Sequence, residues 1–306
     1  MVLFTKSRYK HNVMKKIRVF LDMIKFEHTI FALPFAYIGM VLAWRESGLL
    51  AAPIDWGTLF WQFVWITVAM ASARTAAMAF NRAIDAEIDA RNPRTASRPI
   101  QTGKISKNAV WLAGIISLGV FLFAAWMLNT FVLMLAPIAM IGLVGYAYTK
   151  RFTWLCHIWL GIVDGAAAAG AWAAVTASLN HPVPWLLWAA VTVWIAGFDL
   201  IYACQDVEID RKEGLYSIPA RFGIPAALRL AQIFHVFTVL LLAAVGFVAG
   251  LGWLYWLGLV IVAGLLVYEH SLVKPDDLSK VDIAFFTMNG YISIITLLAV
   301  VGGLVW

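Results

Sequence analysis

The sequence predicts an all-α, polytopic membrane protein with nine transmembrane helices. The chain of 306 residues is 62% hydrophobic and only 13% charged, with a mean hydropathy of +0.83. A soluble domain is about half apolar and about a quarter charged, so this composition indicates a chain that lies mostly in lipid. Apolar segments of about 20 residues span a bilayer core of about 30 Å, and nine such segments follow one another along the chain.

The chain is predicted to divide into a basic cytosolic N-terminal segment, residues 1–24, and a nine-helix domain, residues 25–306. In order, the predicted spans run over Phe26–Trp44, Trp56–Phe80, Ala109–Leu128, Phe131–Tyr148, Trp154–Ala177, Pro184–Cys204, Ala226–Ala249, Trp253–Tyr268 and Ile283–Val305. Trp and Tyr residues lie near many of these ends, as in the aromatic belts of membrane interfaces. Only Asn129 and Thr130 separate the third span from the fourth, so this boundary is the least marked.

The basic residues assign each loop to one side of the membrane. All but two of the 23 Lys and Arg residues fall on one alternating set of segments, namely the N-terminal tail and residues 82–107, 150–151, 206–229 and 270–282. Basic loops stay in the cytosol, so the N-terminus is predicted inside and Trp306 outside, which requires an odd number of spans. The protein is therefore predicted to be integral to the inner, cytoplasmic membrane.

The net charge of +6 is explained by these loops, so no nucleic-acid partner is expected, whereas membrane lipids are. The two cysteines, Cys156 and Cys204, exclude a disulfide framework of any size. No His and Cys cluster has metal-ligand spacing, and the isolated His157 and His235 are expected to make hydrogen bonds between helices.

Two acidic motifs stand at the ends of even-numbered spans. Asn81, Asp85 and Asp89 recur at every fourth position after the second span, and Asp206 and Asp210 have the same spacing after the sixth. Residues four apart lie on one face of a helix. Even-numbered spans run toward the cytosol, so both acidic faces are predicted to meet at the cytosolic surface.

The composition of these motifs favours a hard cation over simple solvated charge. Eight of the 17 acidic residues fall within 85–89 and 199–213, and like charges four apart destabilise a helix unless something neutralises them. Carboxylates without Arg partners are typical Mg²⁺ ligands, and Mg²⁺ is usually held by one or two carboxylates plus phosphate oxygens. Two facing clusters can hold two Mg²⁺ ions bridged by a diphosphate, whose other oxygens would contact nearby Lys and Arg. At a membrane, this predicts a lipid diphosphate.

At this point the chain resembles the UbiA superfamily of intramembrane prenyltransferases, whose signatures are Asn-x-x-x-Asp-x-x-x-Asp on the second helix and Asp-x-x-x-Asp on the sixth. Supporting matches are RTASRP at 94–99, YAYTKR at 146–151 and KEGLYSIPARFG at 212–223. The segment KFEHTIFALPFA at 25–36 resembles the 4-hydroxybenzoate polyprenyltransferase branch. The resemblance covers the chain from about Lys25 to its end.

The resemblance implies nine helices around a central cavity that cytosolic loops cap, and Mg²⁺-dependent transfer of a polyprenyl group from polyprenyl diphosphate to the ring of an aromatic acid in quinone biosynthesis. The implied Mg²⁺ ligands are Asn81, Asp85, Asp89, Asp206 and Asp210. Positive charge at the leaving diphosphate is expected from Lys150, Arg151 and Arg98, with Arg82, Arg94 and Lys212 as further candidates. An allylic carbocation would then be attacked by the acceptor ring.

Several charged or aromatic residues within the spans are further candidates for substrate contact. Arg74 lies seven residues before Asn81 and Asp199 seven before Asp206, so each is expected on the cavity side, one level deeper. Charges inside a membrane are costly and need a named partner, and for Arg74 the candidates are Asp164 and Asp199. Asp199 is also a candidate for binding the acceptor hydroxyl. Tyr146, four before Lys150, is expected to orient that lysine or guide the cation, and Tyr202 to contact substrate.

Alternatives remain at this stage. The segment ARTAAMAFNR at 73–82 also resembles relatives that act on a dihydroxynaphthoate for menaquinone. RTASRP is similar to haem O synthase too, but the second motif of this chain differs from that of the haem O synthase branch. A transporter would place its coupling residues near the bilayer midplane on broken helices, whereas these acids stand at span ends. A CDP-alcohol phosphotransferase would need its single-segment acidic motif, which the sequence lacks.

Overall fold

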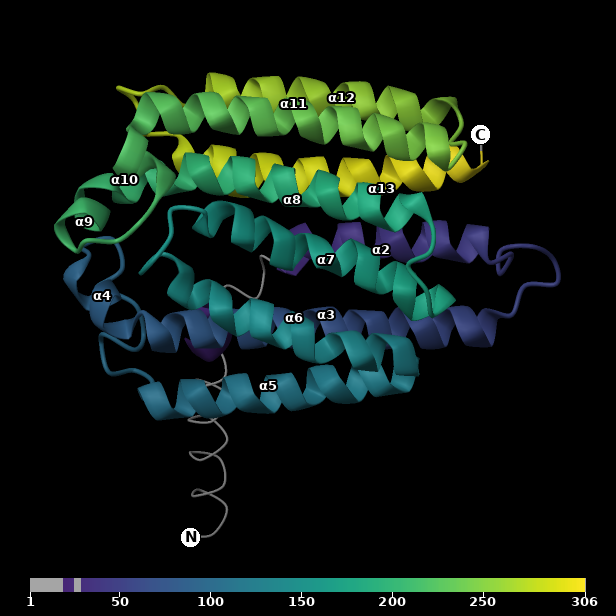
Figure 1. Cartoon of the computed structure of the whole chain (residues 1–306), viewed down its shortest axis with the longest axis horizontal. Helices are drawn as coiled ribbons and strands as arrows, with labels where there is room; N and C mark the ends of the chain where they lie inside the picture. Colours follow the sequence, from purple (N-terminus) through teal and green to yellow (C-terminus); the bar gives the residue numbers. More distant parts are fainter. Residues whose placement is uncertain (1–18, 25–28, 306) are drawn as a thin grey trace, which may run out of the picture.

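The computed structural model describes residues 19–24 and 29–305. Its regular secondary structure in these ranges is helical, with no strand beyond an isolated bridge between Lys274 and Asp277. Its long helices lie side by side along one direction (Figure 1). The elements are α2 (Thr29–Glu46), α3 (Trp56–Ile84), α4 (Ala86–Arg91), α5 (Lys107–Leu128), α6 (Thr130–Thr149), α7 (Cys156–Thr176), α8 (Pro182–Ala203), η2 (Cys204–Asp206), α9 (Val207–Lys212), α10 (Ile218–Phe222), α11 (Ile224–Val248), α12 (Trp253–Ser271), η3 (Ile283–Met288) and α13 (Asn289–Val305).

The prediction of an all-α integral membrane protein is confirmed. Eight helices of the described residues are long and apolar enough to cross a bilayer. The first predicted span corresponds to α2, an 18-residue helix that ends on Arg45 and Glu46, so a count of nine spans stays a prediction. The predicted sides of the termini also stay predictions. Residues 1–18, the start of the first span at Phe26 and the final Trp306 lie outside the described ranges.

The least marked boundary, between the third and fourth spans, is confirmed. Asn129 is extended, with φ −168° and ψ 164°, and it separates α5 from α6. Its side-chain oxygen accepts a hydrogen bond from Val132 N at 2.9 Å, which caps α6. Its amide nitrogen donates to the carbonyls of Ala173 and Ala174 at the end of α7. One residue therefore turns the chain and fixes the turn to a neighbouring helix.

Close backbone approach fixes α7 between α2 and α8. A Cβ atom at Gly39 of α2 would lie 2.1 Å from the carbonyl oxygen of Ala168 in α7, and one at Gly161 of α7 would lie 2.2 Å from that of Thr192 in α8. Only glycine fits at either place, as at other membrane helix interfaces where small residues let backbones meet. This packing sets the position of α8, the helix that leads into the second acidic motif.

Both acidic motifs lie at the same end of the bundle, where the short helices α4, α9 and α10 gather at the left of Figure 1. This end is called the motif end below.

The helices that carry the two motifs are not continuous, although the regular spacing of the acids had suggested continuous helices. Each helix is interrupted at the first aspartate of its motif. Asp85 separates α3 from α4 with φ −88° and ψ 5°, and Asp206 ends η2 with φ −103° and ψ 5°. These values lie in the bridge region, where many active-site residues are found.

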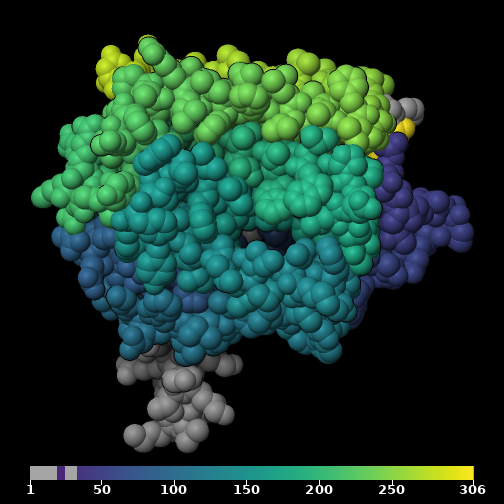
Figure 2. Space-filling model, viewed as in Figure 1, coloured from purple at the N-terminus to yellow at the C-terminus, as the bar shows by residue number. Residues whose placement is uncertain are grey.

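The face of the molecule drawn in Figure 2 is hollowed between the teal segments of α6 and α7, and darker, more distant atoms of early chain segments are visible through the opening. Large apolar side chains of α6 are exposed on the outer surface of the molecule, among them Met134, Ile138 and Ile141. An apolar outer surface of this kind suits contact with lipid rather than water.

Candidate active site

A cavity at the motif end brings together most of the residues predicted from the sequence. Its volume is about 190 Å³. Of the predicted residues, it is lined by Asn81, Arg82, Asp85, Asp89, Arg94, Arg98, Tyr146, Lys150, Asp199, Tyr202, Asp206 and Asp210. Three predicted residues, Arg74, Arg151 and Lys212, are not in its lining.

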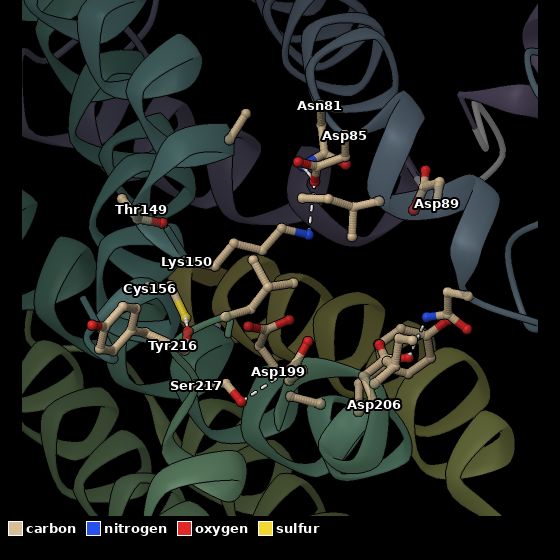
Figure 3. Close-up of a pocket in the computed structure, with 18 of the residues that line it drawn as sticks. Asn81, Asp85, Asp89, Thr149, Lys150, Cys156, Asp199, Asp206, Tyr216 and Ser217 are labelled. Atoms are coloured by element: carbon tan, nitrogen blue, oxygen red, sulfur yellow. Dashed lines mark hydrogen bonds and ion pairs between the residues drawn. The ribbon is translucent and has the colours of Figure 1, made fainter. Parts of the chain in front are cut away.

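Asp85 is the most deeply buried acid of the two motifs, with 3% of its side chain exposed. Its two carboxylate oxygens contact two different basic side chains. Lys150 Nζ lies 2.8 Å from Oδ2 and Arg151 Nη2 lies 2.8 Å from Oδ1. The amide of Asn81 faces the same carboxylate at 3.5 Å. Figure 3 shows the Lys150 side chain reaching across the cavity from the end of α6 to the break after α3.

The other acid of the first motif, Asp89, pairs with an arginine from the segment that follows it. Arg98 Nη1 contacts Asp89 Oδ2 at 2.5 Å, and both side chains line the cavity. The turn that returns Arg98 to this place is fixed by the buried Thr95, whose hydroxyl donates to the backbone carbonyl of Asp89 at 2.8 Å. The RTASRP segment therefore folds back onto the motif that precedes it.

Arg94, in the segment that follows the first motif, joins that segment to the second motif. Its guanidinium binds Asp206 in bidentate fashion, with Nε 3.0 Å from Oδ1 and Nη2 2.5 Å from Oδ2, and Nη1 donates to the hydroxyl of Tyr202 at 2.9 Å. Asn92 donates a further hydrogen bond to Asp206 Oδ1 at 3.0 Å. Burial acts to lower the pKa of the Arg94 guanidinium, but the hydrogen bond and charge of Asp206 outweigh it, so this pKa lies above its ordinary value.

Asp210 has no cationic partner at hydrogen-bond distance among the described residues. Its Oδ2 accepts a hydrogen bond from the hydroxyl of Ser217 at 2.8 Å. Ser217 is also the N-cap of α10, where its oxygen accepts from Ala220 N. Glu213, beyond the cavity lining, forms an ion pair with Arg91 at 2.6 Å, which is a second link between the two motif segments.

Deeper in the bundle, the charged residues form two separate pairs. Arg74 contacts Asp164 at 3.4 Å, so of its two predicted partners the structure selects Asp164. Asp199 instead contacts His157, with Oδ2 2.7 Å from Nδ1. His157 therefore makes the hydrogen bond between helices that its isolated position predicted, but its partner is a cavity carboxylate. Lys212 is exposed at the end of α9.

The donor atoms fit a hard cation that is shared with phosphate. Every candidate ligand offers oxygen, as Mg²⁺ prefers, and the two motifs line one cavity. No three His, Cys, Asp or Glu side chains converge closely enough to hold a metal ion within the described ranges. The premise that these carboxylates lack Arg partners is wrong for Asp85, Asp89 and Asp206, each of which pairs with a base. Phosphate oxygens would therefore have to complete the coordination of a metal here.

Some hydrogen bonds to the motif acids were not predicted, because nothing in the local sequence indicates them. Asn92 and Ser217 bind motif acids, but an isolated Asn or Ser in a loop carries no signal of that kind. Arg94 had a signal, since it begins the RTASRP segment, yet its bidentate contact with an acid 112 residues later depends on tertiary structure. His157 looked like an ordinary buried histidine.

Three comparisons with known proteins agree with this architecture. The model of a family described as the UbiA prenyltransferase family matches residues 32–291. Over 211 residues, the chain is 30% identical to 4-hydroxybenzoate octaprenyltransferase of Photobacterium profundum, covering 69% of this chain and 70% of that protein. The apo structure of a UbiA homolog from Aeropyrum pernix K1 has a TM-score of 0.75 and 31% identity, covering 92% of this chain and 98% of that one.

A second solved structure, a UbiA homolog from Archaeoglobus fulgidus bound to GPP and Mg²⁺, has the same fold. It has a TM-score of 0.64 at 20% identity, covering 94% of this chain and 100% of that one.

Proposed function

The chain belongs to the UbiA prenyltransferase family, and from this membership we propose that it transfers a polyprenyl group from polyprenyl diphosphate to the ring of an aromatic acid of the 4-hydroxybenzoate type, with Mg²⁺ as cofactor. The observation that carries the proposal is the meeting of two acidic motifs, far apart in the chain, in one cavity that also contains Lys150, Arg94 and Arg98. Relatives named 4-hydroxybenzoate octaprenyltransferase support the choice of acceptor.

Five oxygen-bearing side chains would hold the metal, namely Asn81, Asp85, Asp89, Asp206 and Asp210. When bound, two Mg²⁺ ions would offset the negative charge of the diphosphate as it leaves. The homolog bound to GPP and Mg²⁺ makes this pairing of ligand and metal reasonable in the fold.

The basic side chains of the cavity would bind the remaining phosphate oxygens. Lys150 and Arg98 each contact a motif acid now, and each side chain is partly exposed to the cavity, so each can turn from carboxylate to phosphate. The guanidinium of Arg94 now binds Asp206 and Tyr202, so it would have to release Asp206 to bind phosphate in bidentate fashion. Arg82 lines the same cavity and would add long-range positive charge.

Cleavage of the allylic C–O bond leaves a carbocation that needs shielding from water. The rings of Tyr146 and Tyr202 line the cavity, and aromatic faces stabilise positive charge. The polyprenyl tail would lie among the apolar helices, with the hollow between α6 and α7 as a path to lipid. The acceptor would bind beside Asp199, with Arg74 one level deeper, and its ring carbon would attack the cation.

The basic loops favour a site that faces the cytosol of the inner membrane. The motif end carries α4, α9 and α10 with their Lys and Arg residues, and such segments remain on the cytosolic side. This orientation would let a soluble aromatic acid reach the cavity from the cytosol while the lipid diphosphate arrives from the bilayer.

Incubation of the purified protein in lipid nanodiscs with a labelled polyprenyl diphosphate tests the proposal. Prenylated product and diphosphate are expected only with Mg²⁺ and an aromatic acid, and mass spectrometry of products from 4-hydroxybenzoate and a dihydroxynaphthoate identifies the acceptor class. Asp206→Asn should abolish turnover, whereas Glu208→Gln should not, because Glu208 is exposed and outside the cavity. Metal-independent transfer, or full activity of Asp206→Asn, would refute the metal assignment.

A further inference from the structure

His157 contacts two parts of the site through its two ring nitrogens. Nδ1 lies 2.7 Å from Asp199 Oδ2, and Nε2 lies 3.4 Å from the backbone nitrogen of Ile218. A backbone N–H can only donate, so Nε2 must be the unprotonated acceptor, and the ring hydrogen is on Nδ1, where it donates to Asp199. With 3% of the side chain exposed, the imidazole is buried between these two contacts. Its tautomer is therefore fixed by its neighbours.

The second contact of His157 leads to the second acidic motif. Ile218 follows Ser217, the residue whose hydroxyl binds Asp210 at 2.8 Å. The same short segment is held at two further points: Tyr216 N donates to Lys150 O at 2.7 Å, and Cys156 Sγ contacts Tyr216 O at 3.6 Å. Figure 3 shows Cys156, Tyr216 and Ser217 together on one side of the cavity, with Asp199 beside them.

The carboxylate of Asp199 has one oxygen occupied and one available. Oδ2 accepts the hydrogen of His157, and the Asp199 side chain lines the cavity with 16% of its surface exposed. Lys150 pairs with Asp85 and Arg74 pairs with Asp164, whereas the partner of Asp199 at hydrogen-bond distance is the imidazole of His157. A carboxylate held by one oxygen in this way has the direction of its other oxygen set.

We propose that His157 is a positioning residue that holds Asp199 so that its free oxygen, Oδ1, accepts the proton lost by the aromatic ring. This inference rests on the proposed function and deepens it, because it names the base. The allylic C–O bond breaks with its electron pair on the diphosphate, and the ring carbon forms the new C–C bond. The electron pair of the ring C–H bond then returns to the ring, and the proton moves to Asp199 Oδ1. No oxidant or further reactant is needed.

His157 does not itself take the proton in this scheme. Nδ1 already carries a hydrogen, and Nε2 is directed at Ile218 N and not at the cavity. A general base at the correct distance contributes about 10²–10⁴ in rate, and a base that is free to rotate loses part of that contribution. Since Asp199 is in α8 and His157 in α7, the packing of these helices sets the direction of Oδ1.

Two isosteric substitutions separate the two contacts. In His157→Asn, the amide nitrogen stands near the place of Nδ1 and can still donate to Asp199, whereas in His157→Gln, the amide oxygen stands near the place of Nε2 and can still accept from Ile218. We expect His157→Gln and Asp199→Asn to lower kcat about 10²-fold or more, with the KM for polyprenyl diphosphate unchanged. We expect His157→Asn to keep most of the kcat of the unsubstituted protein.

A ring-deuterated acceptor supplies a readout that loss of structure would not produce. If proton removal becomes slow, His157→Gln and Asp199→Asn should show a primary isotope effect on kcat that is larger than in the unsubstituted protein. Equal loss in His157→Asn and His157→Gln without an isotope effect, or wild-type kcat in Asp199→Asn, would overturn the inference. Asp199→Asn tests the assignment of the base even if neither His157 variant folds. Absence of any prenylated product from the unsubstituted protein is a different result, and it would reject the proposed function instead.

Discussion

Lys150 and Arg151 are neighbours that contact the same carboxylate, and the structure predicts opposite consequences for their loss. Lys150 lines the cavity and its contact at hydrogen-bond distance is Asp85. Arg151 is outside the cavity lining and donates to the backbone carbonyls of Ala147 and Ile84 as well as to Asp85. Lys150→Met should therefore reduce turnover with little effect on stability, and Arg151→Met should mainly reduce stability.

The sizes of these effects follow from the contacts. A hydrogen bond to a charged group contributes about 1.5–3 kcal/mol, and 30% of the Arg151 side chain is exposed, so water can replace part of what it loses. For its three bonds we expect about 3 kcal/mol of lost stability in Arg151→Met. Lys150→Met leaves Asp85 paired with Arg151, so about 1 kcal/mol is expected. If Lys150 contacts the leaving diphosphate as proposed, its removal should lower kcat about 10²–10³-fold, by analogy with loss of an oxyanion donor.

Thermal unfolding in nanodiscs and steady-state kinetics of the two variants measure both effects on the same samples. Arg151→Met should unfold at least several degrees below Lys150→Met, since each kcal/mol shifts the midpoint by about 2–4 °C in a chain of this size. Its remaining kcat, measured well below its unfolding temperature, should exceed that of Lys150→Met. The reverse order, in which Lys150→Met is the less stable and the more active variant, would show that the assignment of roles is mistaken.

Three further predictions concern metal, packing and buried charge. Chelation of divalent cations should abolish turnover and Mg²⁺ should restore it, while circular dichroism shows unchanged helix content, because helix packing accounts for the fold. Gly161→Ala should lower the unfolding temperature, since its Cβ would meet the Thr192 carbonyl at 2.2 Å and overpacking costs about 1–3 kcal/mol, whereas Gly170→Ala, with nothing within 4 Å, should not. Arg74→Met should cost about 3–5 kcal/mol in thermal unfolding by leaving Asp164 unpaired, and Arg74→Met with Asp164→Leu should recover much of that loss.

The helices could be predicted from the sequence because the membrane imposes a simple rule on length and polarity. Predicted spans and observed helices differ by only a few residues at most ends, and the turn at Asn129 was found although one extended residue forms it. The interruptions at Asp85 and Asp206 were not predicted. Regular spacing of Asn81, Asp85 and Asp89 is equally compatible with a continuous helix, so the pattern alone could not reveal a local change of backbone.

The composition of the cavity was predictable, but its internal pairing was not. Spacing along a helix identified the acids, and the nearby bases were visible as charges. Which base contacts which acid depends on distances between segments that are far apart in the chain. The pairing of Arg94 with Asp206 rather than with the nearer Asp89, and the contact of Asp199 with His157, follow from helix packing that the sequence does not encode locally.

The links between the two motif segments also set an order of events during synthesis. Arg94 leaves the ribosome 112 residues before Asp206, and Arg91 leaves 122 residues before Glu213. Six long helices, α2, α3, α5, α6, α7 and α8, come before Asp206 in the chain, so they can insert before these arginines meet Asp206 and Glu213. The motif end is therefore completed late, when α9 emerges, and a nascent chain that stops before this point would carry an open, basic loop that a quality-control protease can reach.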